Sequence, residues 1–131
     1  MKTIYTSGKR KTAKARATLK DGKGLIRVNN VLLDLYEPKI YRMKFREPIL
    51  IAGDIVNSVD IDVNVSGGGI ASQADAGRLA IAKALVAHSK GLKNQFLKYD
   101  RTLLVADVRR KENAKPNRHG KARAKVQKSY R

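Results

Sequence analysis

Residues 65–85 of the chain read VSGGGIASQADAGRLAIAKAL. Beyond the glycines, alanine, leucine and isoleucine recur on almost every side of a helix, which is typical of a helix buried in a core. We therefore predict a central core helix over Ile70–Lys90, whose many alanines let neighbouring elements approach closely. Ser72 and Asp75 have the spacing of a capping box, and Gly91 is expected at the C-cap.

The triple glycine Gly67–Gly69 has two interpretations. It does not match the dinucleotide-binding pattern, because Ser72 stands where the third glycine is required, and no Gly-Lys-Ser/Thr follows to make a Walker loop. One interpretation is a strand-to-helix turn in which glycine adopts a positive φ. The other is a place where bare backbone amides at a helix N-terminus meet an RNA phosphate. The two can coexist.

Two segments alternate between apolar and polar residues, as half-buried strands do. Val59–Val65 places Asp60 and Asp62 on its polar face, whereas Ala13–Lys20 places basic residues there. If these strands lie side by side, the opposite charges would help to pair them. The two carboxylates could alternatively hold Mg²⁺. No third carboxylate is close in sequence, so a solvated or ion-paired sheet face is favoured.

The N-terminal part of the chain predicts short strands. Thr3–Thr6 is a short strand that Gly8–Thr12 interrupts. We expect Ala13–Lys20 to form a hairpin with Leu25–Asn29, across a turn at Asp21–Gly24.

The remaining elements are helical. Leu32–Tyr36 predicts one helical turn, and Pro38 suits the start of a helix that runs to about Glu47, where Pro48 stops or kinks it. Leu92, Phe96 and Tyr99 follow the core helix at helical spacing. Leu103–Val108 is apolar enough to dock on the folded part.

The last segment, residues 109–131, reads RRKENAKPNRHGKARAKVQKSYR, with ten Lys or Arg and one acid. It has neither the helical nor the strand pattern of apolar residues, so we predict a basic tail that is disordered when the protein is free. Residues 1–108 are expected to form one globular domain. Within it, residues 1–16 carry six basic groups and no acid, whereas residues 17–108 carry thirteen basic and ten acidic groups.

A net charge of +18 in 131 residues points to a nucleic-acid or anionic-membrane partner. The chain has no apolar run of about 18 residues, and the tail has no apolar face to insert into a bilayer, so nucleic acid is favoured and no membrane partner is expected. Without cysteine, and with His88 and His119 isolated, a metal site has little support and no cofactor is expected. A purely solubilising tail is the simpler alternative.

Four motifs together resemble one family. They are SGKRKTAKARA (Ser7–Ala17), IRVNN (Ile26–Asn30), the glycine-helix stretch of residues 65–85, and the ending KVQKSYR (Lys125–Arg131). Their order over nearly the whole chain resembles ribosomal protein nine of the small subunit. The ending Gln-Lys-Ser-Tyr-Arg is similar to the archaeal and eukaryotic branch, since bacterial members typically end in Ser-Lys-Arg.

The resemblance implies an α+β fold of order β-β-β-α-β-α with a left-handed crossover, like the second domain of ribosomal protein five. It also implies a cytoplasmic place in the ribosome, in the head of the small subunit, beside rRNA and neighbouring ribosomal proteins. The tail would reach the peptidyl-site tRNA.

Phosphate contact is expected to dominate binding, with little direct readout of bases. On the core helix, Arg78 and Lys83 are the charges expected to remain exposed. The residues expected to contact rRNA are Lys9, Arg10, Lys11, Lys14, Arg16, Gly67, Gly68, Gly69, Arg78, Arg109, Arg110, Lys111, Arg118, Lys121, Arg123 and Lys125. By motif position, the resemblance assigns the tRNA contact to Arg131, with Lys128 and Ser129 nearby.

Two other classes of protein remain open at this point. A free nucleic-acid-compacting protein would bind duplex DNA as well as rRNA and would not need to sediment with ribosomes. An RNA-processing enzyme would show metal-dependent turnover that is lost when Asp60 or Asp62 is changed.

Overall fold

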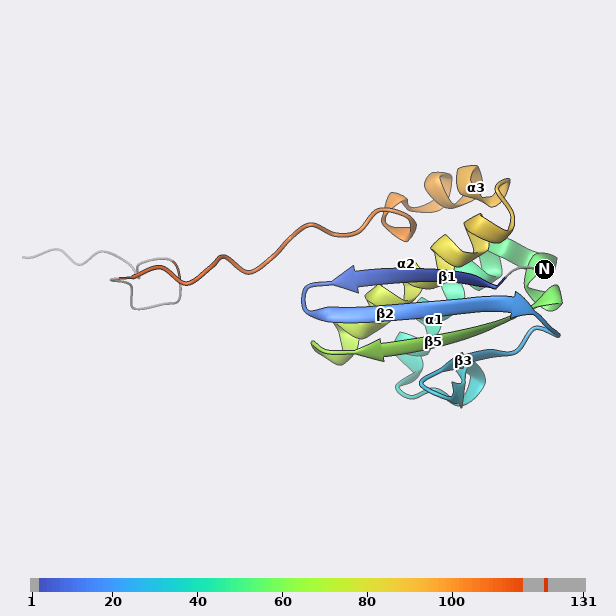
Figure 1. The fold of residues 1–131 in the computed structure, drawn as a ribbon, viewed down its shortest axis with the longest axis horizontal. Coiled ribbons are helices and arrows are strands. Elements are labelled where there is room, and N and C mark those ends of the chain that lie inside the picture. Colours follow the sequence, from blue (N-terminus) through green and yellow to red (C-terminus); the bar gives the residue numbers. More distant parts are fainter. Residues whose placement is uncertain (1–2, 117–121, 123–131) are drawn as a thin grey trace, which may run out of the picture.

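The computed structural model describes residues 3–116 and residue 122 (Figure 1). The order of elements confirms an α+β fold and the predicted β-β-β-α-β-α succession, to which a short fourth strand and a third helix are added. The elements are β1 (Ile4–Arg10), β2 (Ala13–Asp21), β3 (Ile26–Val28), β4 (Val31–Leu32), α1 (Lys39–Ala52), β5 (Val59–Ser66), α2 (Ile70–His88) and α3 (Leu92–Tyr99), with 3₁₀ turns at Leu33–Leu35, Gly53–Ser58 and Arg101–Leu103.

The strands form one sheet in the order β1-β2-β5-β3-β4. Neighbouring strands are antiparallel except β3 and β5, which run parallel and are joined through α1. The expected hairpin between Ala13–Lys20 and Leu25–Asn29 is therefore wrong, because β5 lies between them. Both segments hydrogen-bond to β5 instead, one on each side.

The hairpin that does form joins β1 to β2 through a two-residue turn. Lys11, in this turn, has a φ of 54°. The strand was expected to stop before Gly8, but β1 continues to Arg10. Gly8 is buried against α2, and a Cβ atom there would lie 3.0 Å from the backbone nitrogen of Ala80. Glycine thus permits close packing of the strand on the helix.

Helices cover only one face of the sheet among the described residues (Figure 1). The apolar side chains of β2 and β5 point to that face, whereas their polar neighbours remain at least partly exposed. Helix α2 packs there with nine buried residues, which confirms the predicted central helix. No described element covers the opposite face, which we call the open face of the sheet.

One expectation about a proline and one about a helix cap differ from the structure. Helix α1 continues through Pro48 to Ala52. Proline removes one helical hydrogen bond, but the Pro48 ring is fully buried, so core packing opposes the break. Helix α2 begins at Ile70 after Gly69, with no side-chain cap, so the capping box of Ser72 and Asp75 is wrong. Asp75 pairs with basic residues from other elements instead.

The chain after α2 is partly as expected. Gly91 is the N-cap of α3 and not the C-cap of α2, which ends at His88. Helix α3 buries Leu92 and Phe96, as the spacing predicted, whereas Tyr99 at its end is exposed. Leu103 is also fully buried, whereas Val108 is 85% exposed, so docking ends before the tail begins. None of the helices in residues 3–116 has both the length and the apolarity needed to cross a membrane.

Candidate nucleic-acid interface

The tip of the β1–β2 hairpin lies beside the start of the tail. We call Arg10–Thr12 the hairpin tip and Arg109–Lys111 the tail root. Together they line a groove of about 680 Å³, the cationic groove. Five of its six lining residues are Lys or Arg and none is acidic. The fold thus joins two basic segments that lie about a hundred residues apart in the sequence.

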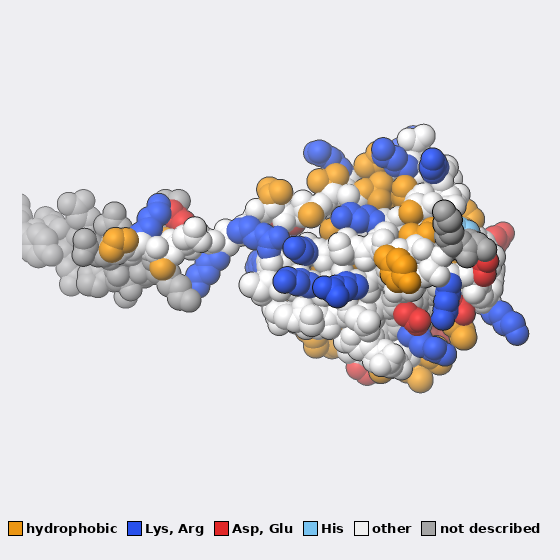
Figure 2. Space-filling model, in the orientation of Figure 1, with side chains coloured by type: hydrophobic (Ala, Val, Ile, Leu, Met, Phe, Trp, Pro, Cys, Tyr) orange, Lys and Arg blue, Asp and Glu red, His pale blue; other side chains and the backbone are white. Residues whose placement is uncertain are grey.

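The open face of the sheet continues this basic surface. Lys9 on β1 and Lys14 on β2 are directly opposite each other, and both are exposed. Like charges in such a pair are destabilising unless an anion lies between them. Arg16 is exposed one step further along β2. Figure 2 shows Lys and Arg side chains gathered at the end of the molecule where the chain leaves towards the tail.

The other end of the same sheet face carries both signs of charge, because Asp60 and Asp62 lie opposite Lys20 and Arg27. The strands do pair, and Asp60 on β5 faces Lys20 on β2, but Lys14 and Arg16 face Ser66 and Asn64, so opposite charges meet at one pair only between β2 and β5. Asp60 also accepts hydrogen bonds from the backbone N–H groups of Leu25 and Lys23, both at 3.0 Å. Chiefly because of these two bonds, the pKa of Asp60 lies below its ordinary value. Asp60 thus ties the loop before β3 to β5, and among the described residues no cluster of three or more potential metal ligands is present.

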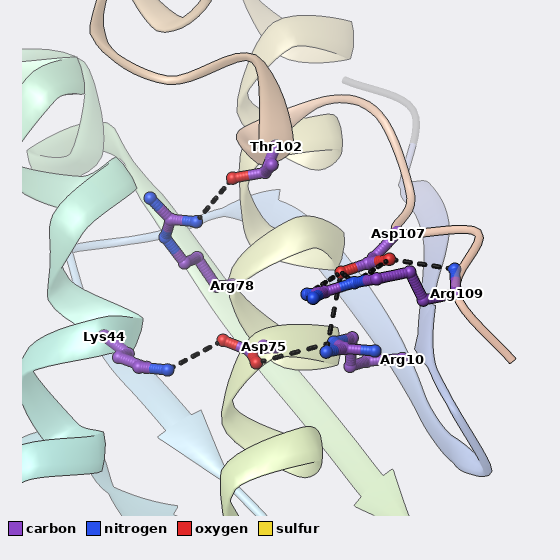
Figure 3. Close-up of polar contacts among 7 residues, drawn as sticks. All are labelled: Arg10, Lys44, Asp75, Arg78, Thr102, Asp107 and Arg109. Carbon is purple, nitrogen blue, oxygen red and sulfur yellow. Dashed lines mark hydrogen bonds and ion pairs between the residues drawn. The ribbon is translucent and has the colours of Figure 1, made fainter. Parts of the chain in front are cut away.

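Arg10 takes part in a network of ion pairs (Figure 3). Its guanidinium lies 3.5 Å from Asp107 and 3.9 Å from Asp75, and Asp75 is also paired with Lys44 of α1 at 3.0 Å. Only 15% of the Arg10 side chain is exposed. Arg10 is therefore held to α1, α2 and the segment before the tail, and it borders the groove as part of the framework.

Asp107 joins this network to the tail root. Its carboxylate accepts hydrogen bonds from both the backbone and the side chain of Arg109, the shortest being 2.7 Å from Nη2. The side-chain bonds from Arg109, followed by its backbone bond, hold the pKa of Asp107 far below its ordinary value. Asp107 is thus ionised at neutral pH. It was not among the predicted site residues, although one signal was visible: it is the single acid between Arg101 and Lys111.

Arg78 is mostly buried and not exposed as expected. Its side chain, 12% exposed, pairs with Glu47 of α1 at 2.5 Å and with Asp100 at 3.2 Å. It also donates to the Thr102 hydroxyl at 3.2 Å (Figure 3). These bonds link α1, α2 and the end of α3, so Arg78 has a structural role. Lys83 is half-buried and donates to the Ser7 carbonyl at 3.2 Å.

The triple glycine is a tight strand-to-helix turn beside the hairpin tip. Gly67 and Gly68 have φ values of 76° and 59°, which confirms the expected positive φ, whereas Gly69 has a φ of −98°. A Cβ atom on Gly67 would lie 2.7 Å from the Thr12 carbonyl oxygen, and one on Gly69 would meet nothing within 4 Å. The turn is therefore built by the first two glycines. Phosphate contact by the three stays a prediction.

Several predicted contacts lie outside the described residues. They are Arg118, Lys121, Arg123 and Lys125 for rRNA, and Lys128, Ser129 and Arg131 for tRNA. The predicted disorder of the tail also falls largely on these positions. Of the other predicted rRNA contacts, Lys9, Lys11, Lys14, Arg16, the glycines and the tail root are exposed at the hairpin end of the fold.

Comparison with known proteins gives a consistent result. A family model described as ribosomal protein S9/S16 matches residues 8–131. A small ribosomal subunit protein uS9 from Methanococcus maripaludis (strain DSM 14266) is 53% identical over 134 residues, covering 100% of both chains. A protein of the same name from Methanococcus vannielii is 52% identical, again over 100% of both chains.

Proposed function

This chain belongs to the family of ribosomal protein S9/S16, and from that membership we infer that it binds small-subunit rRNA through its hairpin end. As a member of the family it is a structural component of the small ribosomal subunit and not an enzyme. It belongs to the ribosome of the cytoplasm, with rRNA and other ribosomal proteins as its partners.

One observation carries the proposed binding surface: the hairpin tip and the tail root form one cationic groove. The opposed lysines Lys9 and Lys14 extend it onto the open sheet face. Phosphate oxygens are the natural partners of such a surface, because neutralising them releases condensed counterions. We place the rRNA backbone against this end of the fold, in the head of the subunit.

We further propose that the tail, residues 109–131, extends from this end to the tRNA in the peptidyl site. The support is its composition, ten Lys or Arg with one acid, and its start beside the groove. By the family resemblance, Arg131 contacts the tRNA, with Lys128 and Ser129 nearby. The globular part, residues 1–108, acts as the anchor.

The rRNA proposal is tested by comparing the full chain with a chain ending at residue 108. The full chain should sediment with small subunits in a cell extract and prefer small-subunit rRNA to duplex DNA of equal length. Removing the tail should flatten the dependence of log affinity on log salt, by about 0.9 for each duplex phosphate that the tail neutralises, or about 0.7 for each single-stranded one. Sedimentation apart from ribosomes, with equal binding to DNA, would point to a general compacting protein.

The tRNA proposal is tested on small subunits that carry either the full chain or a chain lacking Arg131. Loss of one charge-assisted hydrogen bond should weaken peptidyl-site tRNA by at most about 1.5–3 kcal/mol, with subunit assembly unchanged. Arg131→Lys is the matched control, because it keeps the charge but not the bidentate fork. Equal tRNA dissociation rates for the full and shortened chains at low and moderate salt would refute the assignment.

A further inference from the structure

The acidic side chain of Asp107 lies at the edge of the groove that is proposed to bind phosphate, where a negative charge is unfavourable for binding. Asp107 lies between Arg10 and Arg109, which both line the cationic groove. A negative charge there repels phosphate and cancels part of the attraction that the arginines supply. By charge alone, the protein would bind RNA better without it. However, the hydrogen bonds and ion pairs of Asp107 order the start of the tail, which favours binding.

The start of the tail is exposed and irregular. Val108 is 85% exposed, and residues 109–116 form neither helix nor strand. Asp107 binds Arg109 twice over, accepting from its backbone N–H at 2.9 Å and from its guanidinium at 2.7–3.1 Å. This combination holds both the direction of the chain and the orientation of the Arg109 side chain.

The same carboxylate attaches the tail root to the folded domain. Asp107 pairs with Arg10, Arg10 with Asp75, and Asp75 with Lys44 (Figure 3). The series runs from the tail root through β1 and α2 to α1. The Arg109 side chain remains 77% exposed, so a guanidinium that is held in place still faces solvent, where a phosphate can reach it.

We propose that Asp107 is a positioning residue for RNA binding, which holds the tail root against the hairpin tip and so builds the cationic groove as a site for the RNA sugar-phosphate backbone. This inference rests on the proposed rRNA-binding function. A pre-oriented arginine loses less conformational entropy when it binds. Asp107 engages Nε and Nη2 of Arg109, so the edge of the guanidinium at Nη1 is the part held ready to donate to a phosphate. The ordering gained outweighs the one negative charge added.

The two effects of Asp107 have opposite signs, so one substitution separates them. Asp107→Asn removes the charge and keeps the side-chain shape. If charge alone matters, the variant binds small-subunit rRNA more tightly; if Asp107 positions the groove, it binds more weakly. We expect binding to weaken about two- to fivefold, the range that an exposed ion pair supports. Asp54→Asn is the matched control, because it removes the same charge from an exposed position before β5, at the sheet end opposite the hairpin tip.

Asp54→Asn should bind rRNA as well as the unchanged protein or slightly better. Arg109→Lys, a second variant, keeps the charge but loses the fork, and should weaken binding in the same direction as Asp107→Asn. The Nε–H signal of Arg109 in the free protein gives a readout independent of RNA. It should be sharp and shifted in the unchanged chain and should move to the position of a solvated arginine in Asp107→Asn.

Binding by Asp107→Asn that equals or exceeds that of Asp54→Asn would overturn the inference, and so would an unchanged Arg109 signal. The proposed function is judged separately, by whether the unchanged chain prefers small-subunit rRNA to duplex DNA. If that preference were absent, the comparison of the two aspartate variants on duplex DNA would still decide whether Asp107 positions the groove.

Discussion

A close contact between α1 and α2 predicts that Gly77→Ala destabilises the protein. In the interior of a helix this change ordinarily stabilises, because alanine has the highest helix propensity. Gly77 lies buried on α2, and the fully buried ring of Phe45 on α1 lies directly against it. A Cβ atom on residue 77 would be 3.0 Å from Cδ1 and from Cζ of Phe45, and closer still to Cε1.

The magnitude follows from two opposing effects. Carbon atoms in contact are ordinarily about 3.5–4.0 Å apart, so the Phe45 ring would have to move within a packed core. Overpacking of this kind costs about 1–3 kcal/mol, whereas the gain in helix propensity is about 1 kcal/mol. We expect a net destabilisation near the upper end of the difference, about 2 kcal/mol. For a folded domain of this size, each kcal/mol lowers Tm by about 4–8 °C.

Urea unfolding of the full chain measures this effect, with a fall in midpoint and an unchanged m-value expected. Gly91→Ala is the matched control. Gly91 already has helical φ and ψ values of −63° and −21°, and a Cβ atom there meets nothing within 4 Å. Its substitution should leave stability unchanged or raise it by up to about 1 kcal/mol, because alanine restricts the unfolded chain.

A second substitution tests the cause. Phe45→Leu should destabilise the unchanged protein, since it removes buried volume. Combined with Gly77→Ala, it should cost less than the two single changes together, because the smaller side chain leaves room for the new methyl group. If Gly77→Ala were as stable as Gly91→Ala, or if the two changes were simply additive, the steric reasoning would be refuted.

Three further predictions concern the turn, the sheet and the helix network. Gly68→Val should cost about 1–2 kcal/mol or more, because a side chain is strained at its positive φ, whereas Gly69→Val should cost less; equal destabilisation in thermal unfolding would contradict this. The lowered pKa of Asp60 means that its bonds stabilise the fold above about pH 4 and cease to do so as the pH falls through the lower, folded-state value. The stability difference between the unchanged chain and Asp60→Asn should therefore shrink on acidification, and a constant difference would exclude this role. Arg78→Lys should lower stability by about 1 kcal/mol in urea unfolding, because the single lysine nitrogen cannot replace both Nη2, which meets the two carboxylates, and Nη1, which donates to Thr102; an unchanged midpoint would show that the guanidinium is dispensable.

The sequence predicted those elements whose apolar pattern is strong by itself. The alternation at Val59–Val65 and the nearly continuous apolar surface after Ile70 each allow one secondary structure, and both are present. Strand partners were harder to predict, because a turn signal at Asp21–Gly24 shows that the chain bends but not what it bends beside. The continuation of α1 through Pro48 is hard to predict for a related reason. The cost of a proline to the local helix is evident in the sequence, whereas the packing that opposes the break comes from residues far along the chain.

The candidate site is likewise predictable only in part from the sequence. Charge density alone correctly indicated a basic surface near Lys9–Arg16, and the fold adds the tail root to it. The sequence did not show which arginines are already engaged, since Arg10 and Arg78 meet carboxylates that are distant in the chain. Their assignment as rRNA contacts stays a prediction, and the structure adds a role for both in holding the fold.

The unequal distribution of acids is consistent with a division of labour within one chain. The folded part has almost as many acids as basic residues between positions 17 and 108, and several of those acids hold arginines in place. Glu47 and Asp100 engage Arg78, and Asp75 engages Arg10. A buried or half-buried arginine needs such a partner, whereas for an arginine that binds phosphate a carboxylate partner has two opposing effects, since its charge repels the phosphate and its hydrogen bonds order the side chain. Asp107 stands between the folded part and the tail, where the last carboxylate before the tail orders the first arginine of the tail.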